Sequence, residues 1–277
     1  MFLEYPYSLS EVKLRAQQID QDQISDEDLI SAYKTIFECI DLTTLEATDN
    51  AETIKALCEK ALNYNNTGDG STVAAICIYM PFIKQAKNLL AGSGLQVATV
   101  ACSFPSGQLP LPLKLAEVGW AAAEGADEID MVISRGKMIE NDFDAILNEV
   151  QSVKKACGNA HLKVILETGE LQSVELIRKA SELALLGGAD FLKTSTGKVS
   201  PAATPEAAVI MLDSIMEYYL KTGKKVGFKP AGGIAEPAVA LTYYKLVKRI
   251  LGDEWLNKKL FRIGASRLAD KVKTLIS

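Results

Sequence analysis

The stretch from Gly188 to Lys198, GADFLKTSTGK, combines a short apolar run with a polar loop that ends in glycine. We interpret it as a strand that leaves a buried core and enters an exposed loop. Lys193 directly follows Phe191 and Leu192, where a buried strand normally carries valine or isoleucine. Because lysine is seldom buried without a partner, Lys193 is a candidate for amine chemistry.

Eight apolar runs of this kind follow one another along the chain. Most are nearly continuous rather than alternating, which is typical of parallel strands covered on both faces. Their centres recur about every 24 to 36 residues, the length of a strand plus a crossover helix. We therefore predict an α/β protein with a (β/α)₈ TIM barrel, and a doubly wound open sheet is the alternative. The runs cover residues 39–45, 73–79, 97–102, 128–133, 162–167, 189–194, 226–229 and 261–265.

The segments between these runs carry helix signals. Asn141 with Asp144 is expected to cap one helix, and proline at a first turn indicates two more, after Thr204 and after Glu236. The pair Gly187-Gly188 is expected to close another helix.

Residues 1–35 are predicted to form a helical extension packed across one end of the barrel. The motif Ser25-Asp26-Glu27-Asp28 resembles a capping box, and apolar residues follow it at helical spacing. Residues 36–277 are predicted to form one catalytic barrel domain, since a chain of 277 residues with 48% hydrophobic residues can bury one large core.

Composition argues against several functions. A net charge of −5 offers no basic face for nucleic acid or for an acidic membrane surface. Residues 1–6 do not combine a basic region with a following apolar segment, and no apolar run reaches about 18 residues, so we expect a cytoplasmic protein. Five cysteines without a C-x-x-C pair and a single histidine, His161, argue against disulfides, a metal site or a histidine-activated nucleophile. No metal and no cofactor are predicted.

Charged residues interrupt the apolar runs near their carboxyl ends, where barrel enzymes carry their chemistry. These residues are Asp130, Glu167, Lys193 and Lys229. Neighbouring strands lie roughly 4.8 Å apart, so residues of similar height converge inside a barrel. Lys163 begins its run and is interpreted as structure at the bottom of the barrel.

Two lysines beside one carboxylate indicate amine chemistry. Two close ammonium groups repel and burial disfavours charge, so the pKa of one lysine should fall until it is a free amine near neutral pH. Lys193, beside apolar neighbours, is the better nucleophile for a Schiff base. Lys229 is the better permanent cation, and Asp130 is its counter-ion and a proton carrier.

Glycines follow three successive late runs, at Gly197-Lys198, Gly232-Gly233 and Gly264-Ala265-Ser266. Such exits expose backbone N–H groups, and the loops after strands seven and eight are the usual phosphate site of a barrel. The alternative interpretation is that these glycines only form turns. Gly68-Asp69-Gly70 is interpreted only as a turn.

Taken together, these motifs closely resemble the deoxyribose-phosphate aldolase family. The resemblance rests on DLTTL at 41–45, EIDMV at 128–132, LETGEL at 166–171, FLKTSTGK at 191–198 and GFKPAGG at 227–233. It extends from about residue 38 to 270. The resemblance implies a metal-free class I aldolase on a TIM barrel, which cleaves 2-deoxy-D-ribose 5-phosphate reversibly to acetaldehyde and D-glyceraldehyde 3-phosphate.

The resemblance also implies roles for individual residues. Lys193 would form the Schiff base, Lys229 would lower the pKa of Lys193, and Asp130 would take part in proton relay. Substrate and phosphate contacts would fall on Thr44, Thr196, Gly197, Lys198, Gly232, Gly233, Gly264 and Ser266. The chain departs from many members at Ala235, where they carry arginine, and at Arg267, which could supply that missing cation.

Other functions fit parts of the pattern. Another class I aldolase or a transaldolase would share the lysine chemistry, and a pyridoxal-phosphate barrel enzyme would join a lysine to a phosphate site. A non-catalytic sugar-phosphate-binding barrel is the alternative from a different class. The expected partners are a sugar phosphate and aldehydes, without nucleic acid or membrane, and a homodimer is possible.

Overall fold

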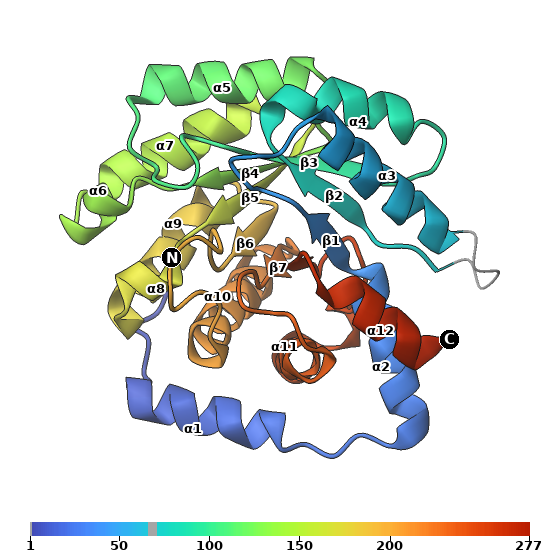
Figure 1. The fold of residues 1–277 in the computed structure, drawn as a ribbon. Coiled ribbons are helices and arrows are strands. Elements are labelled where there is room, and N and C mark those ends of the chain that lie inside the picture. The colour runs from blue at the N-terminus through green and yellow to red at the C-terminus, as the bar shows by residue number, and fades with distance from the viewer. Residues whose placement is uncertain (1, 66–70) are drawn as a thin grey trace.

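All eight apolar runs are strands, and they stand side by side around one axis (Figure 1). The computed structural model describes residues 2–65 and 71–277, so the turn predicted at 68–70 lies outside it. The strands are β1 (Ile40–Thr43), β2 (Ala75–Ile78), β3 (Gln96–Ala101), β4 (Glu128–Val132), β5 (His161–Ile165), β6 (Phe191–Lys193), β7 (Gly227–Lys229) and β8 (Ile263–Ala265).

The strands form one parallel sheet in the order β7-β6-β5-β4-β3-β2-β1-β8. The first and last strands of this order, β7 and β8, meet through two isolated bridges, Phe228 with Phe261 and Ala231 with Gly264. The sheet is therefore a nearly closed barrel. The predicted (β/α)₈ TIM barrel is confirmed, and the alternative of a doubly wound open sheet is wrong.

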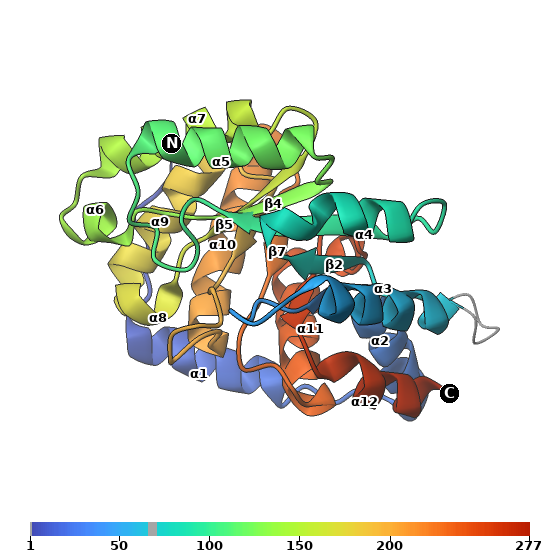
Figure 2. The ribbon, with the colours of Figure 1, turned by 45° about the horizontal axis from the view of Figure 1, so that its top comes forward.

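Helices lie between consecutive strands and after β8, and they cover the outside of the barrel (Figures 1 and 2). They are α3 (Ala51–Asn65), α4 (Ile83–Leu89), α5 (Leu111–Ala123), α6 (Arg135–Ile139), α7 (Phe143–Ala156), α8 (Thr168–Leu171), α9 (Val174–Leu186), α10 (Pro205–Thr222), α11 (Pro237–Leu251) and α12 (Leu268–Ile276), with short 3₁₀ turns at Met80–Phe82 and Asp253–Trp255.

The helix ends follow local sequence signals. The side chain of Thr204 accepts a hydrogen bond from the Ala207 N–H at the start of α10, and Pro205 occupies the first turn. Gly187 ends α9, as predicted. The cap predicted at Asn141 is wrong by one residue, because Asp142 accepts the N–H of Ala145 at the start of α7. Asn141 instead has a left-handed backbone, with φ 63°.

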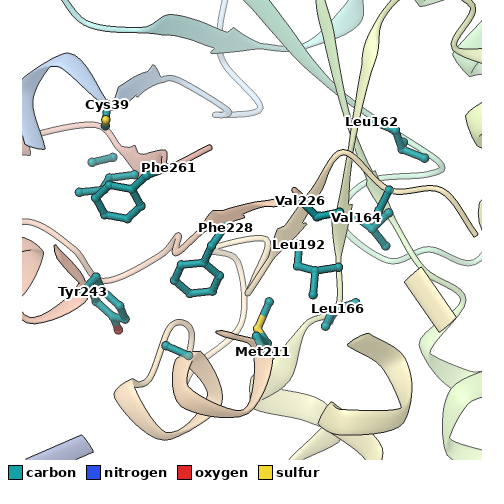
Figure 3. Packing of buried hydrophobic residues seen from close by; sticks show 14 of the residues in the cluster. Cys39, Leu162, Val164, Leu166, Leu192, Met211, Val226, Phe228, Tyr243 and Phe261 are labelled. Carbon is teal, nitrogen blue, oxygen red and sulfur yellow. The ribbon is translucent and has the colours of Figure 1, made fainter. Parts of the chain in front are cut away.

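Alternate strand residues face the helices, which leaves their neighbours facing the barrel axis. In Figure 3 Leu192 and Phe228 point from their strands toward Met211 of α10. The strand residues on either side of Leu192 and of Phe228 therefore point inward. The interior is tightly filled, since a Cβ at Gly227 would stand 2.3 Å from the Phe191 ring.

The N-terminal extension contains α1 (Leu9–Asp20) and α2 (Asp26–Glu38). The expected packing across one end of the barrel is wrong for α1, which lies along the outside of α10 and α11 (Figures 1 and 2). Both guanidinium N–H groups of Arg15 donate to Asp213 of α10, at 2.6 and 2.8 Å, and the Tyr5 hydroxyl donates to the same carboxylate.

The second helix, α2, packs against α11 and α12 and leads directly into β1. Ser25 accepts the N–H of Asp28 at its start. The helix continues to Glu38, so the boundary predicted at residue 35 falls inside it. The extension therefore passes into the barrel without a linker.

The five cysteines are buried and free. Burial raises the pKa of the Cys58 thiol to about 11 and that of Cys157 to about 12. These thiols are thus protonated core side chains near neutral pH. Within residues 2–65 and 71–277, no helix combines the length and the apolar character needed to cross a membrane.

Candidate active site

Lys193 and Lys229 stand side by side on β6 and β7, where they are paired in register. Both point inward, since Leu192 and Phe228 point outward between the strands and helices (Figure 3). Asp130 reaches them from β4. Its Oδ2 atom accepts from the Lys193 ammonium or amine at 2.6 Å and from Lys229 at 2.7 Å. The structure therefore brings the three predicted catalytic side chains together.

Four further charged side chains surround these three. Lys229 also donates to Asp41 of β1, and Lys163 donates to Glu128 and, at 3.2 Å, to Asp130. Below them, Arg262 donates to Asp41 at 2.6 Å and to both oxygens of Glu128, at 2.6 and 3.0 Å. All seven side chains are buried in the barrel. We call this set the buried charge network: Asp41, Glu128, Asp130, Lys163, Lys193, Lys229 and Arg262.

The network corrects the interpretation of Lys163 as bottom structure alone. Its amine contacts Asp130 directly and lies 3.9 Å from Asp41. Lys163 thus belongs to the same charge cluster as the two predicted catalytic lysines. The register of the sheet accounts for this contact, because Asp130 on β4 is paired with Lys163 on β5.

Charge counting and the carboxylate contacts within the network together point to Lys193. Three carboxylates face four basic side chains, so the interior is neutral when one of the three lysines is uncharged. Lys193 donates to one carboxylate, whereas Lys163 and Lys229 each donate to two. A net charge on the buried interior would be costly in this low-dielectric space. The neutral amine is therefore the form of Lys193 that the network favours.

The pKa directions agree with this count. Burial and the neighbouring Lys229 lower the pKa of Lys193, although Asp130 opposes them. Burial alone would lower the pKa of Lys229, but Asp130 and Asp41 outweigh it and raise that pKa above its ordinary value. Burial would raise the pKa of Asp130, yet Lys163, Lys193 and Lys229 hold it well below its usual range. The site thus pairs an amine of lowered pKa with an ammonium of raised pKa and a carboxylate.

A cavity of about 250 Å³ opens above Lys193 at the carboxyl ends of the strands. Apart from Lys193, seven of the predicted binding residues line it: Thr196, Gly197, Lys198, Gly232, Gly233, Gly264 and Ser266. Thr44 is placed differently. Among the described residues Thr43 and Leu45 line the cavity, whereas the Thr44 hydroxyl donates to Asp49 at 2.9 Å.

Glycine is required where two of these loops meet. Gly197 and Gly232 have positive φ angles of 78° and 85°, which side chains rarely adopt. A Cβ at Gly232 would stand 2.5 Å from the Ala202 Cβ and 2.9 Å from the Gly197 Cα. The N–H of Gly264, in contrast, already donates to the Pro230 carbonyl at 3.0 Å, so it is not free for a ligand.

The cavity rim includes both positions at which the chain departs from the family. Ala235 and Arg267 both line the cavity. Lys198 faces it too, and its amine pairs with Glu46 at 3.1 Å. A phosphate in this cavity would meet glycine backbone and two basic side chains.

Sequence reasoning missed Asp41, Glu128 and Arg262 as parts of the site. The available signal was a charged residue inside an apolar run, flanked by residues that face the helices. Asp41 stands between Ile40 and Leu42, for example. What the sequence could not show is which strands would bring these charges together.

Comparison with known proteins places these features in context. A profile of the DeoC/LacD family of aldolases matches residues 35–251. The human deoxyribose-phosphate aldolase is 45% identical over 248 residues, which cover 86% of this chain and 78% of the relative, and the mouse enzyme is 46% identical with the same coverage. The tetrameric deoxyribose phosphate aldolase of Aeropyrum pernix superposes with a TM-score of 0.70 at 21% identity, covering 92% of this chain and 99% of that chain.

Proposed function

This chain belongs to the DeoC/LacD family of aldolases and cleaves 2-deoxy-D-ribose 5-phosphate by a reversible aldol reaction, and we propose that Lys193 carries the substrate as a Schiff base. The observation that supports this role is the buried charge network. Its three carboxylates are balanced when one lysine is uncharged, and Lys193 has the fewest carboxylate partners and a lowered pKa, which favours it as the free amine. A free amine is what addition to an aldehyde requires.

The proposed reaction begins on the open-chain sugar. The Lys193 amine adds to the C1 aldehyde, and loss of water gives an iminium ion. This cation draws the electron pair of the C2–C3 bond as that bond breaks, while the C3 hydroxyl loses its proton and becomes the aldehyde of glyceraldehyde 3-phosphate. The enamine that remains on Lys193 is protonated at C2, and hydrolysis of the resulting imine releases acetaldehyde and the amine.

Asp130 and Lys229 are proposed to serve this chemistry without forming bonds to the substrate. The depressed pKa of Asp130 makes its acid form scarce, so a water molecule held by its carboxylate is the better proton shuttle. The raised pKa of Lys229 keeps it an ammonium beside Asp130. Lys229 therefore acts mainly through its charge, by disfavouring a proton on Lys193.

The phosphate is proposed to bind at the cavity rim. Support comes from Gly197, Gly232 and Gly233 and from the basic side chains of Lys198 and Arg267, all of which line the cavity. Arg267 is the cation proposed to compensate for Ala235. Thr44 lies outside this lining, so we propose no direct phosphate contact for it.

Borohydride trapping with acetaldehyde, followed by peptide mapping, tests the role of Lys193. We expect an ethyl group on the peptide that contains Lys193, and we expect Lys193→Leu to lose both the label and the turnover of deoxyribose 5-phosphate. Lys137→Leu, which removes an exposed lysine, is the control and should keep both. Turnover that survives in Lys193→Leu would refute the assignment.

A cytoplasmic location and a homodimer are also proposed. The five free, buried cysteines support a reducing compartment. Leu113 and Trp120 support self-association, since they are 53% and 47% exposed and stand seven residues apart on one face of α5. Cell fractionation tests the location. The molar mass from light scattering tests the homodimer. We expect a dimer for the unchanged protein and a monomer for Trp120→Glu.

A further inference from the structure

Glu167 is a buried carboxylate that the proposed reaction does not use. It follows β5 at the mouth of the barrel and has no exposed surface. Its backbone is left-handed, with φ 55°, a conformation that is costly for a residue other than glycine. A buried charge in a costly conformation indicates that the surrounding structure holds this side chain for a purpose.

The carboxylate of Glu167 takes up both donors of Thr196. The Thr196 N–H donates to it at 3.2 and 3.4 Å, and the Thr196 hydroxyl donates at 2.5 Å. The hydroxyl oxygen in turn accepts the backbone N–H of Lys198 at 3.1 Å. Thr196 therefore has no donor left for a phosphate, and its place in the cavity rim is that of a link. Glu167 fixes the loop on which Gly197 and Lys198 stand.

Arg135, which follows β4, holds Glu167 in turn. One terminal nitrogen of its guanidinium lies 3.4 Å from Glu167 and 2.8 Å from Glu170. The other donates to the backbone carbonyls of Pro105 and Ser106 in the loop after β3, at 2.9 and 2.7 Å. The exits of four successive strands are thus joined through Arg135 and Glu167 to the phosphate rim.

Lys193 is held independently of this linkage. Its carbonyl accepts the N–H of Leu166 at 3.0 Å, and the next residue, Thr194, donates its N–H to the Lys229 carbonyl at 3.1 Å. The Thr194 hydroxyl also accepts the N–H of Ala231 at 3.0 Å. Strand pairing therefore positions the reacting amine, whereas the side chain of Glu167 positions the loop three to five residues further along.

We propose that Glu167 is a positioning residue that sets the preference of the enzyme for a phosphorylated sugar. Resting on the function proposed above, it holds the loop of Thr196, Gly197 and Lys198 in the shape that receives the phosphate, and takes no part in Schiff-base chemistry. Only an acceptor without protons satisfies both Thr196 donors and Arg135. Glutamine has the same shape but offers one oxygen and an NH₂ group that meets another donor.

The test compares Glu167→Gln with the unchanged protein on 2-deoxy-D-ribose 5-phosphate and on unphosphorylated 2-deoxy-D-ribose. We expect the KM for the phosphorylated sugar to rise about tenfold, the usual effect of one lost hydrogen bond to a charged group. The kcat/KM for the unphosphorylated sugar and the borohydride trapping of acetaldehyde should stay within about twofold. Equal losses on both sugars, or no loss on either, would overturn the proposal.

Two further variants complete the test. Glu170→Gln is the matched control, because Glu170 pairs with the same arginine but does not contact Thr196, and it should leave the ratio of the two sugars unchanged. Thr196→Val removes the hydroxyl link and should lower that ratio as Glu167→Gln does, while Thr196→Ser should restore it. The Thr196 pair decides the question if Glu167→Gln does not fold. An unchanged protein inactive on deoxyribose 5-phosphate would instead reject the proposed function.

Discussion

Replacement of Lys229 by methionine should protonate Lys193 near neutral pH. The two nitrogens bond the same Asp130 oxygen at 2.6 and 2.7 Å, so they lie no more than about 5.3 Å apart. With an effective dielectric constant of about 20, a charge on Lys229 disfavours a charge on Lys193 by about 3 kcal/mol. Its loss should lower the fraction of free Lys193 amine at a fixed pH by on the order of a hundredfold. The charge count of the network points the same way.

The assay is the rate of borohydride trapping of acetaldehyde as a function of pH. Because protonation blocks addition, the rate in Lys229→Met should be strongly reduced near pH 7 and should recover as the pH rises. Lys114→Met is a matched control, since Lys114 is another buried lysine that pairs with Glu149 elsewhere in the fold. Its trapping profile should not move along the pH axis. An unchanged profile in Lys229→Met, with the fold checked by circular dichroism, would refute the electrostatic reasoning.

Three smaller changes test the cavity rim and the frame. Glu46→Gln removes a carboxylate that is 71% exposed and competes with the phosphate for Lys198, so the KM for deoxyribose 5-phosphate should fall, by up to about fivefold in steady-state assays. Gly232→Ala forces a Cβ against Gly197, and the same assay should show a KM raised by at least about tenfold. Thr204→Ala removes the cap of α10 and should cost about 1 kcal/mol in urea unfolding, with kcat unchanged.

The strands were predictable because each is a short, nearly continuous apolar run between helix signals. The pairing of Lys193 with Lys229 could equally be predicted from the sequence. Both lysines end apolar runs, and parallel strands of equal height in a barrel place such residues next to each other. Local chemistry was sufficient in these cases, because the period of the chain repeats the same strand and helix unit.

The charged residues lower in the barrel were harder to predict from the sequence. Arg262 and Glu128 are separated by 134 positions, and they meet only because the barrel closes between β7 and β8. No local pattern states which strand will stand opposite another. The position of α1 was missed for a similar reason, since Arg15 finds Asp213 on α10, a partner 198 positions away.

Thr196 shows a different limit. The motif places it beside Gly197, where a phosphate contact is the natural expectation. The structure shows that its two donors are already occupied by Glu167. A sequence lists donors and acceptors but does not show which are already satisfied.

The charge balance inside the barrel has a consequence for attempts to transplant this chemistry. A lysine placed alone at the solvent-exposed end of a barrel strand in another protein would keep its proton, because neither burial nor a neighbouring ammonium would lower its pKa. A working graft would have to include the matched set of Asp41, Glu128, Asp130, Lys163, Lys229 and Arg262. The unit that could be moved to a new scaffold is therefore the filled interior of the barrel.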